Sequence, residues 1–318
     1  MGACRLTGII LTVTAAAVAA STVAVSAATP AVAAPGAAVP AAAVTAGALT
    51  APGRAAIVAP HVAAPNVRVR GGELVNHGSG ARLWGQAINV KRPMASITKV
   101  MAALVVLRAG HLDRRIKVTR KAVSYVRRNG ASNAGLVAGD VLTARQLLKA
   151  MLIPSGCDAA FLLATSYGPR RPVFVRKMNA MAKSMGLTST HFAHFDGLPI
   201  PTGRATYSTP RDLVRLGEQA MRNPLFHRIV AVRTFRVAAR PHHHGYVWRT
   251  TNKLLGSYRG AIGIKTGNTN AAGNCLLFEA RRGGHTLIGV ILHANPSSNW
   301  DALFSAARRV LNWGFRRV

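Results

Sequence analysis

The sequence predicts an α/β (α+β) fold: an antiparallel sheet built from strands at both ends of the chain, flanked by helices, with an inserted all-helical lobe. Strand patterns occur near residue 73 and again after residue 261, and helical patterns dominate between them. Gly-rich turns join neighbouring strands in both groups, as antiparallel hairpins require. Roughly 250 residues follow the N-terminal region, which favours one domain with two lobes.

The first 65 residues are predicted to lie outside this fold. A short charged start precedes an apolar run rich in Ala, Thr and Ser, and small-residue cleavage sites follow. This order is typical of a secretory signal peptide, predicted here as residues 1–28, with a retained membrane anchor as the alternative. Residues 29–65 are mostly Ala, Val, Pro, Gly and Thr without periodicity, which predicts a disordered tether. Residues 66–318 would form the folded domain.

The charge balance is strongly basic. The chain has 41 Lys and Arg against 9 Asp and Glu, a net charge of +32, which attracts polyanions. Predicted export, the lack of a nucleic-acid-binding motif and only 6 % aromatic residues argue against nucleic acid. We therefore expect anionic cell-wall polymers as charge partners. Removal of Cys4 with the signal peptide would leave Cys157 and Cys275, too few for a disulfide framework.

The elements are expected in the following order. A hairpin of strands 73–75 and 82–84 and a loop at 85–92 lead to a helix that runs from Ser96 to about residue 107. Further helices are expected at 142–153, 159–165 and 173–185, and a capping box at 208–212 opens another, with Thr209 as cap and Asp212 reaching back. Strands at 234–237, 261–266, 274–281 and 285–294 and a basic amphipathic helix at 300–313 complete the chain.

Ser96 and Lys99 form the first motif that carries chemistry. Positions i and i+3 share one face of a helix, so Ser96 Oγ and Lys99 Nζ can meet. Serine is a weak nucleophile until a neighbouring base takes its proton, and a neutral lysine can be that base. The start of the helix adds free N–H groups that favour an oxyanion on a substrate beside Ser96. Ser-x-x-Lys alone is common, so the hypothesis needs further motifs.

Two further motifs follow in order: Ser155-Gly156-Cys157 in a turn between helices, and Lys265-Thr266-Gly267 on a strand. With them, residues 72–318 resemble the serine-type D-alanyl-D-alanine carboxypeptidases and transpeptidases, the low-molecular-mass penicillin-binding proteins. The phrases that carry the resemblance lie at 93–99, 152–160, 195–199, 207–209, 251–255 and 263–267. The resemblance implies the penicillin-binding/β-lactamase-like transpeptidase fold.

The resemblance also implies a role for each motif residue. Ser96 would attack the carbonyl between two D-alanines, and Lys99, kept neutral by burial and by Lys265, would be the base. Ser155 would relay the proton to the leaving D-alanine.

The third motif would hold the substrate. Lys265, Thr266 and Gly267 would bind its terminal carboxylate, and the backbone N–H groups of Ser96 and Asn268 would form the oxyanion hole. The implied substrate is the D-Ala-D-Ala end of peptidoglycan stem peptides, and β-lactams would be covalent inhibitors. The implied enzyme is an exported monomer that uses no cofactor and no metal.

Cys157 departs from the family pattern, in which Asn usually occupies this position. A thiol is a weak hydrogen-bond partner for the substrate amide, so transpeptidation remains open beside carboxypeptidation, as in some actinobacterial DD-transpeptidases with Ser-Gly-Cys. A disulfide with Cys275 and an oxidisable thiol are also open. A Cys157 nucleophile is disfavoured because no base accompanies it.

Other functions fit the sequence less well. A β-lactamase needs a glutamate to activate water, yet the only glutamates are Glu73, Glu218 and Glu279, so penicillin is expected to acylate Ser96 and stay. A Ser-His-Asp hydrolase using His191, His194 and Asp196 lacks a Gly-x-Ser-x-Gly elbow. Residues 242–244, three consecutive histidines, are expected in a basic surface loop rather than a metal site. A non-catalytic wall-binding protein would have no need of the nucleophile and base.

Overall fold

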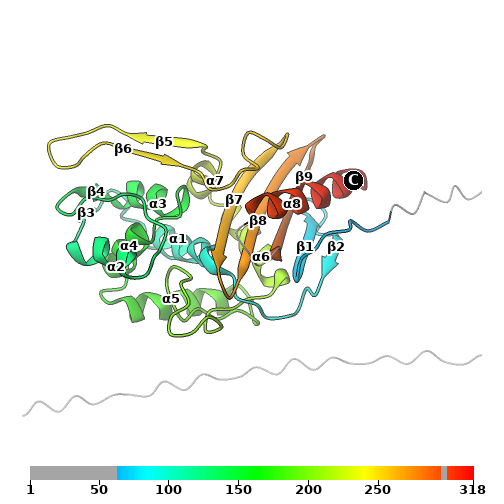
Figure 1. Ribbon diagram of the computed structural model, residues 1–318, viewed down its shortest axis with the longest axis horizontal. Helices are drawn as coiled ribbons and strands as arrows, with labels where there is room; N and C mark the ends of the chain where they lie inside the picture. Colours follow the sequence, from blue (N-terminus) through cyan, green and yellow to red (C-terminus); the bar gives the residue numbers. More distant parts are fainter. Residues whose placement is uncertain (1–62, 295–298) are drawn as a thin grey trace, which may run out of the picture. The chain divides into compact units, whose positions relative to one another are not determined.

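The computed structural model describes residues 63–294 and 299–318 (Figure 1). The predicted signal peptide and nearly all of the predicted tether lie outside the described residues. The described part contains a five-stranded antiparallel sheet in the order β2-β1-β9-β8-β7. Its strands are β1 (Gly71–Asn76), β2 (Arg82–Gln86), β7 (Ala261–Thr269), β8 (Gly273–Arg282) and β9 (His285–Ala294). The predicted sheet from both chain ends is therefore confirmed.

Strand β1 joins the two ends of the chain. Leu74 of β1 faces Trp84 of β2 on one side and Gly289 of β9 on the other. Among residues 63–294 and 299–318, strand β7 pairs with β8 alone, so its outer edge has no strand partner there. An edge strand presents unpaired peptide groups, and this edge leads to the third motif.

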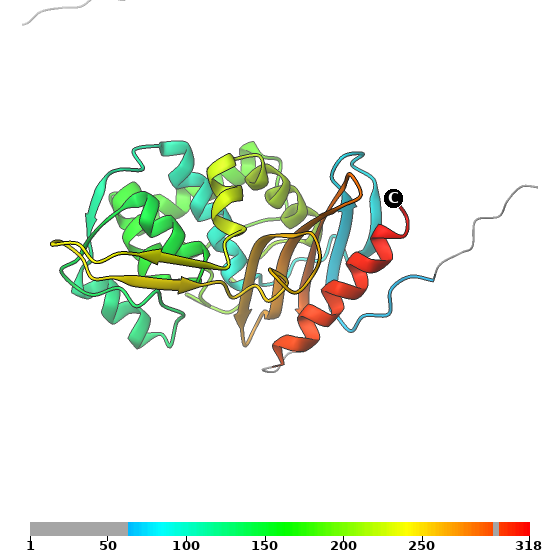
Figure 2. The same cartoon turned by 90° about the horizontal axis from the view of Figure 1, so that it is seen from above.

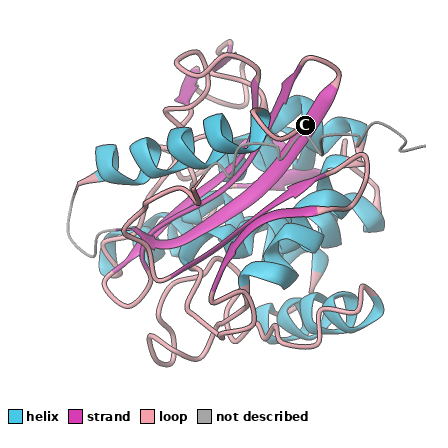
Figure 3. Cartoon of the chain, turned by 90° about the vertical axis from the view of Figure 1, so that its right-hand side faces the viewer, coloured by secondary structure: helices cyan, strands magenta, loops and turns pink. Residues whose placement is uncertain are grey.

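Helices cover both faces of the sheet (Figures 2 and 3). On one face α8 packs against a cluster that includes Leu276, Phe278 and Ile291. On the other face α6 approaches so closely that a Cβ on Gly217 would lie 2.9 Å from Ile288. The helices are α1 (Thr98–Ala109), α2 (Arg120–Arg128), α3 (Ala144–Leu152), α4 (Cys157–Tyr167), α5 (Arg171–Ser184), α6 (Pro210–Met221), α7 (Pro224–Val230) and α8 (Trp300–Phe315). In this described part, no helix has both the length and the hydropathy of a bilayer span.

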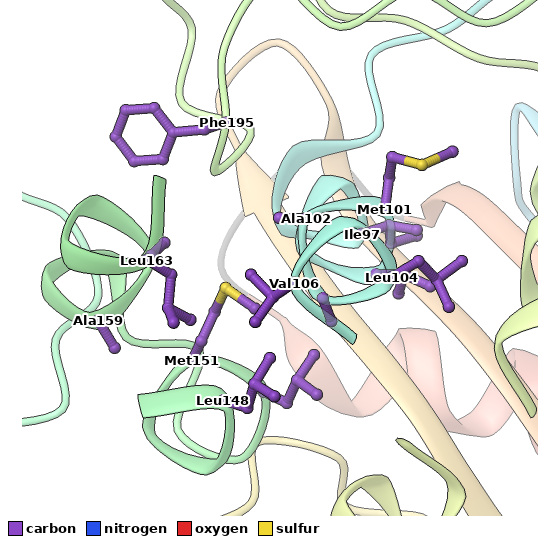
Figure 4. Packing of buried hydrophobic residues seen from close by; sticks show 14 of the residues in the cluster. Ile97, Met101, Ala102, Leu104, Val106, Leu148, Met151, Ala159, Leu163 and Phe195 are labelled. Atoms are coloured by element: carbon purple, nitrogen blue, oxygen red, sulfur yellow. The ribbon is translucent and has the colours of Figure 1, made fainter. Parts of the chain in front are cut away.

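Helix α1 is the centre of the helical lobe. Every residue from Thr98 to Val106 is buried, which explains why the sequence here is apolar without an amphipathic stripe. Figure 4 shows side chains of α3 and α4, including Leu148, Met151 and Leu163, around this helix. Such close packing fixes the position of the residues at the start of α1.

Several short elements differ from the sequence prediction. Strands β3 (Arg115–Lys117) and β4 (Val141–Thr143) pair with each other, and β5 (Thr234–Val237) pairs with β6 (Tyr246–Arg249). Of these four strands only β5 was predicted, because a strand of three or four residues rarely shows a clear alternating pattern in the sequence. Leu142 lies in β4 rather than in a helix, and α3 begins after Thr143, which forms a capping box with Gln146.

The predicted capping box at α6 is half correct. The Thr209 side chain accepts from Asp212 N at 3.1 Å, and Pro210 occupies the first helical position. The Asp212 carboxylate, however, accepts from Ser189 N at 2.9 Å and Thr190 Oγ1 at 2.8 Å. Asp212 therefore links a distant loop to the start of α6. Its carboxylate binds these two donors instead of the backbone N–H of Thr209, which a capping box would use.

Glu279 of β8 makes the stability of the protein depend on pH. Burial, and then the charge of Glu218, raises the pKa of Glu279 to about 7 from its ordinary 4.5. Folding therefore binds a proton between these values, and stability falls as the pH rises through this window. We expect Glu279→Gln to increase the free energy of unfolding by about 2 kcal/mol at pH 8 and hardly at pH 5. Denaturant unfolding at both pH values measures this.

Glu73→Gln is the matched control. Glu73 is also buried, but its carboxylate forms an ion pair with Arg82 Nε at 2.7 Å. Removal of the Glu73 charge should therefore destabilise the fold at both pH values. An equal gain from Glu279→Gln at pH 5 and pH 8 would contradict the titration of this carboxyl.

Candidate active site

Ser96 lies in a single 3-10 turn, η1 (Ala95–Ile97), directly before α1. Ala95 has φ of 48°, in the left-handed region that alanine rarely occupies, so packing holds this turn in place. Lys99 Nζ donates to Ser96 Oγ at 2.7 Å, the contact that the spacing predicts. Lys99 is fully buried whereas Ser96 is partly exposed. The hydroxyl is thus open to a substrate and the amine behind it is not.

A second contact fixes the Lys99 amine. Lys99 Nζ also donates to the backbone carbonyl of Asp196 at 3.0 Å. The next residue, Gly197, has φ of 85°, and a Cβ there would collide with the carbonyl of Ala95. Only glycine lets this loop approach so closely, and the approach places the Asp196 carbonyl beside the amine.

The Asp196 carboxylate is buried behind Lys99 in a hydrogen-bond network. It accepts from Tyr125 Oη at 2.7 Å and contacts His194 Nδ1 at 2.7 Å. Burial alone would raise the pKa of Asp196, but the His194 hydrogen bond and the Lys99 charge outweigh it and hold the pKa below its usual value. His194 and Asp196 therefore lie on the lysine side of the site, unlike in the Ser-His-Asp alternative. Tyr125 was not predicted, because no local pattern marks it.

The second motif forms the turn before α4. Ser155 is buried and has φ of 68°, again an uncommon conformation for a residue with a Cβ. Ser132 Oγ donates to the Ser155 carbonyl at 2.9 Å. The buried Asp158 carboxylate accepts from Ala134 N and Ala159 N, and so joins the 132–136 loop to the first turn of α4. These contacts hold the Ser155 backbone in place.

Cys157 is a buried free thiol, 1 % exposed, with Sγ 3.8 Å from Ser132 Oγ. Burial raises its pKa to about 11, although the nearby Lys99 charge opposes this. Cys275 is also free and buried, so the predicted disulfide alternative is wrong. A protonated, inaccessible thiol is neither a nucleophile nor an oxidation-prone group at neutral pH.

The third motif lies on β7. Lys265 is 1 % exposed, and its Nζ donates to the Thr266 carbonyl at 2.9 Å. Burial, and then the charge of Lys99, lowers the pKa of Lys265 well below its ordinary value. In addition to burial, the charge of Lys99 acts on Lys265, so the two amines influence each other as the motifs predict. The neutral state of Lys99 stays a prediction.

The backbone of the first motif lies so close to Gly267 that this position has no room for a side chain. A Cβ on this residue would lie 2.9 Å from both the Met94 carbonyl and Ser96 N. The third motif therefore contacts the first directly. Thr266 Oγ1 lies 2.5 Å from Thr251 Oγ1, a partner that was not predicted although it lies in the 251–255 phrase. Asn268 Nδ2 donates to Asn274 Oδ1 at 2.7 Å, which links this side chain to the neighbouring strand β8.

Other residues considered from the sequence have structural partners. Glu73 and Glu218 pair with Arg82 and His77, and Glu279 lies on β8 near Glu218. Within the described ranges none of the three contacts Ser96 or Lys99.

The prediction that the three histidines at 242–244 form a basic surface loop is only partly correct. His243 is buried, and His244 contacts the Asp140 carboxylate at 2.8 Å. Among residues 63–294 and 299–318, no group of three or more His, Cys, Asp or Glu side chains is placed to hold a metal ion.

The arrangement combines a nucleophile, a contacting amine, a second buried hydroxyl and an edge strand with a buried cation. Residues 59–296 match the peptidase S11 family, described as D-alanyl-D-alanine carboxypeptidase. The chain belongs to this family. This S11 peptidase is 42 % identical over 258 residues to the D-alanyl-D-alanine carboxypeptidase of Streptomyces sp. strain K15, covering 77 % of this chain and 86 % of the relative.

Other comparisons agree with the S11 assignment. The chain is 37 % identical to DacB2, a D-alanyl-D-alanine carboxypeptidase of Mycobacterium tuberculosis, over 74 % of this chain and 79 % of that protein. The crystal structure of the Streptomyces K15 DD-transpeptidase matches with a TM-score of 0.75 and 39 % identity, over 80 % of this chain and 100 % of that chain. These matches confirm the fold class and the family that the motifs predict.

Proposed function

We propose that the chain is a serine DD-peptidase that cleaves the bond between the terminal D-alanines of peptidoglycan stem peptides through an acyl-enzyme on Ser96. The observation that carries this proposal is the 2.7 Å contact between Lys99 Nζ and Ser96 Oγ, with Gly267 packed against Ser96 N. It brings the first and third motifs together at one partly exposed hydroxyl. Family membership supports the same substrate class.

Acylation assigns a role to each group. Lys99 takes the Ser96 proton as Oγ attacks the penultimate carbonyl, and the N–H groups of Ser96 and Asn268 stabilise the oxyanion. Ser155 passes a proton to the departing D-alanine nitrogen as the peptide bond breaks. Water then attacks the ester carbonyl, releases the shortened peptide and restores the Ser96 hydroxyl.

Lys265 and Thr266 bind the terminal carboxylate of the substrate in this proposal. The lowered pKa of Lys265 means that its amine readily loses its proton in the free enzyme. An incoming carboxylate favours the charged amine, so binding couples to proton uptake at this lysine. A substrate without a terminal carboxylate lacks this favourable interaction with the charged Lys265 amine, which explains selection for the end of a peptide.

Transpeptidation is the second candidate, favoured by Cys157. Its buried thiol replaces the amide that most of the family presents to the substrate, and one similar solved structure is of a DD-transpeptidase. The test is D-alanine release from a D-Ala-D-Ala peptide by the full chain, with and without an acceptor amine. Hydrolysed product in both cases supports the carboxypeptidase; product only as the acceptor adduct supports the transpeptidase. Absence of D-alanine release in every condition would contradict both.

Cys157→Ala should leave the site of acylation unchanged. Its thiol is buried, and burial raises its pKa to about 11, so it is not the nucleophile. We expect Cys157→Ala to form an adduct with one benzylpenicillin molecule, located by peptide mass mapping on the segment that contains Ser96. An adduct mapped to Cys157 in the wild type and lost in this variant would contradict the assignment.

The proposal places the enzyme outside the cytoplasm. The N-terminal sequence supports export, and the net charge of +32 supports retention on anionic wall polymers. β-Lactams are proposed as slowly released covalent inhibitors, because no glutamate contacts Ser96 within the described residues. Secretion of an epitope-tagged full chain, followed by its release from walls at high salt, tests the placement.

A further inference from the structure

A pocket rich in cationic side chains lies beside the candidate active site. It has a volume of about 360 Å³, and the side chains of Arg70, Lys91, Arg92 and Arg204 line it. No Asp or Glu is among its lining residues. Among the described residues, none of these four side chains forms an ion pair, although Lys91 lies over the ring of Tyr207. We call this the cationic pocket.

Two polar atoms at the cationic pocket are buried and unpaired. Arg92 Nε and His293 Nε2 have no hydrogen-bond partner within the described part of the chain. Burial, and then the charge of Arg70, lowers the pKa of both side chains. Buried unsatisfied groups and like charges both cost stability. An anion in the cationic pocket would relieve both costs.

The cationic pocket lies a short distance from the reacting bond. Pro93, which lines it, is three residues before Ser96, and Ala271, which also lines it, is three residues after Asn268. Three residues span at most about 10 Å, so the pocket lies within this reach of the oxyanion site.

The proposed function sets the direction of the substrate. With the terminal carboxylate bound by Lys265 and the scissile carbonyl at the Asn268 N–H, the acyl part would continue toward the end of β7. The turn after β7 contains Ala271, which places the pocket on the acyl side.

We infer that the cationic pocket binds a carboxylate carried by the acyl part of the substrate, one or two residues before the penultimate D-alanine. An extended peptide advances about 3.4 Å per residue, so a side chain at this place spans the remaining distance. The inference rests on the proposed function, because the direction of the substrate follows from it. The cationic pocket would make the enzyme select stem peptides by their charge upstream of the scissile bond.

Matched peptide pairs test this inference. Each pair ends in D-Ala-D-Ala and differs only in a free carboxylate or a primary amide, at the first or the second residue before the penultimate D-alanine. We expect kcat/KM for D-alanine release by the full chain to be about tenfold higher with the carboxylate in one pair, since it gains charge-assisted hydrogen bonds. The preference should shrink as salt is raised.

Two double variants locate the effect. Lys91→Gln/Arg204→Gln changes two exposed side chains of the cationic pocket and should reduce the carboxylate preference to less than about twofold. Arg120→Gln/Lys121→Gln removes the same charge from exposed positions on α2 and should retain the preference. Thermal melting checks that both variants fold. Equal kcat/KM for carboxylate and amide peptides in the wild type would overturn the inference, as would equal loss in both variants.

Failure of the proposed function gives a different result. If no peptide releases D-alanine, the peptides are tested as competitors that slow acylation by benzylpenicillin. A lower inhibition constant for the carboxylate peptide still supports the cationic pocket, and equal constants overturn it. If polyglycerol phosphate binding is lost in Lys91→Gln/Arg204→Gln while peptide preference is unchanged, the pocket binds wall polymer and the inference is wrong.

Discussion

Replacing Ser96 with alanine is expected to abolish acylation of the chain by benzylpenicillin. The wild type should gain the mass of one drug molecule and keep it, whereas Ser96→Ala should show no adduct, a loss of at least about a thousandfold in rate. The reason is geometric: Ser96 is the partly exposed hydroxyl at 2.7 Å from Lys99 Nζ. Intact-protein mass spectrometry over time measures the result. D-alanine release should be lost in parallel.

Ser132→Ala is the control for this experiment. Ser132 Oγ donates to the Ser155 carbonyl, so Ser132→Ala can slow acylation by loosening Ser155, but it leaves the Ser96 hydroxyl in place. The Ser132→Ala protein should therefore still form the adduct, at the wild-type rate or more slowly. An adduct of normal rate in Ser96→Ala would show that another group is the nucleophile. Rapid consumption of the drug by the wild type would instead support a β-lactamase.

Replacing Lys99 with methionine is expected to slow acylation by about a thousandfold, within the range typical for loss of a general base. Methionine has a similar length and suits the fully buried position, so the fold should remain. Without the amine, no group with a contact to Ser96 Oγ in the described structure can accept its proton. Stopped-flow measurement of acylation by a chromogenic β-lactam, together with thermal melting, gives the rate and the stability.

Lys117→Met is the matched control, because Lys117 is exposed on β3. It should acylate at the wild-type rate. If Lys99→Met acylates within about threefold of the wild type, Lys99 is not the base, and the proton must leave by another route. Lys265, whose pKa is lowered by burial and by Lys99, would then be the next candidate.

Local patterns were sufficient wherever an element is long or bounded by marked turn residues. The β8–β9 hairpin follows from alternating strands around Gly283 and Gly284, and α8 from its amphipathic stripe. Strand β6 and helix α7 were missed because they are short, and helix α2, as long as the predicted α3, was missed as well. The role of Asp212 was wrong because its partners, Ser189 and Thr190, are more than 20 residues away in sequence.

The sequence by itself determined the fold class, the family and the pairing of Ser96 with Lys99, since motif order and helix periodicity are local properties. Only the tertiary structure decided the electrostatics. The lowered pKa of Lys265, the free buried thiol of Cys157 and the contact of the Asp196 carbonyl with the Lys99 amine depend on burial and on contacts between distant segments. Such contacts form only when the sheet and the helical lobe pack together, because a charge's solvation is set by its whole surroundings.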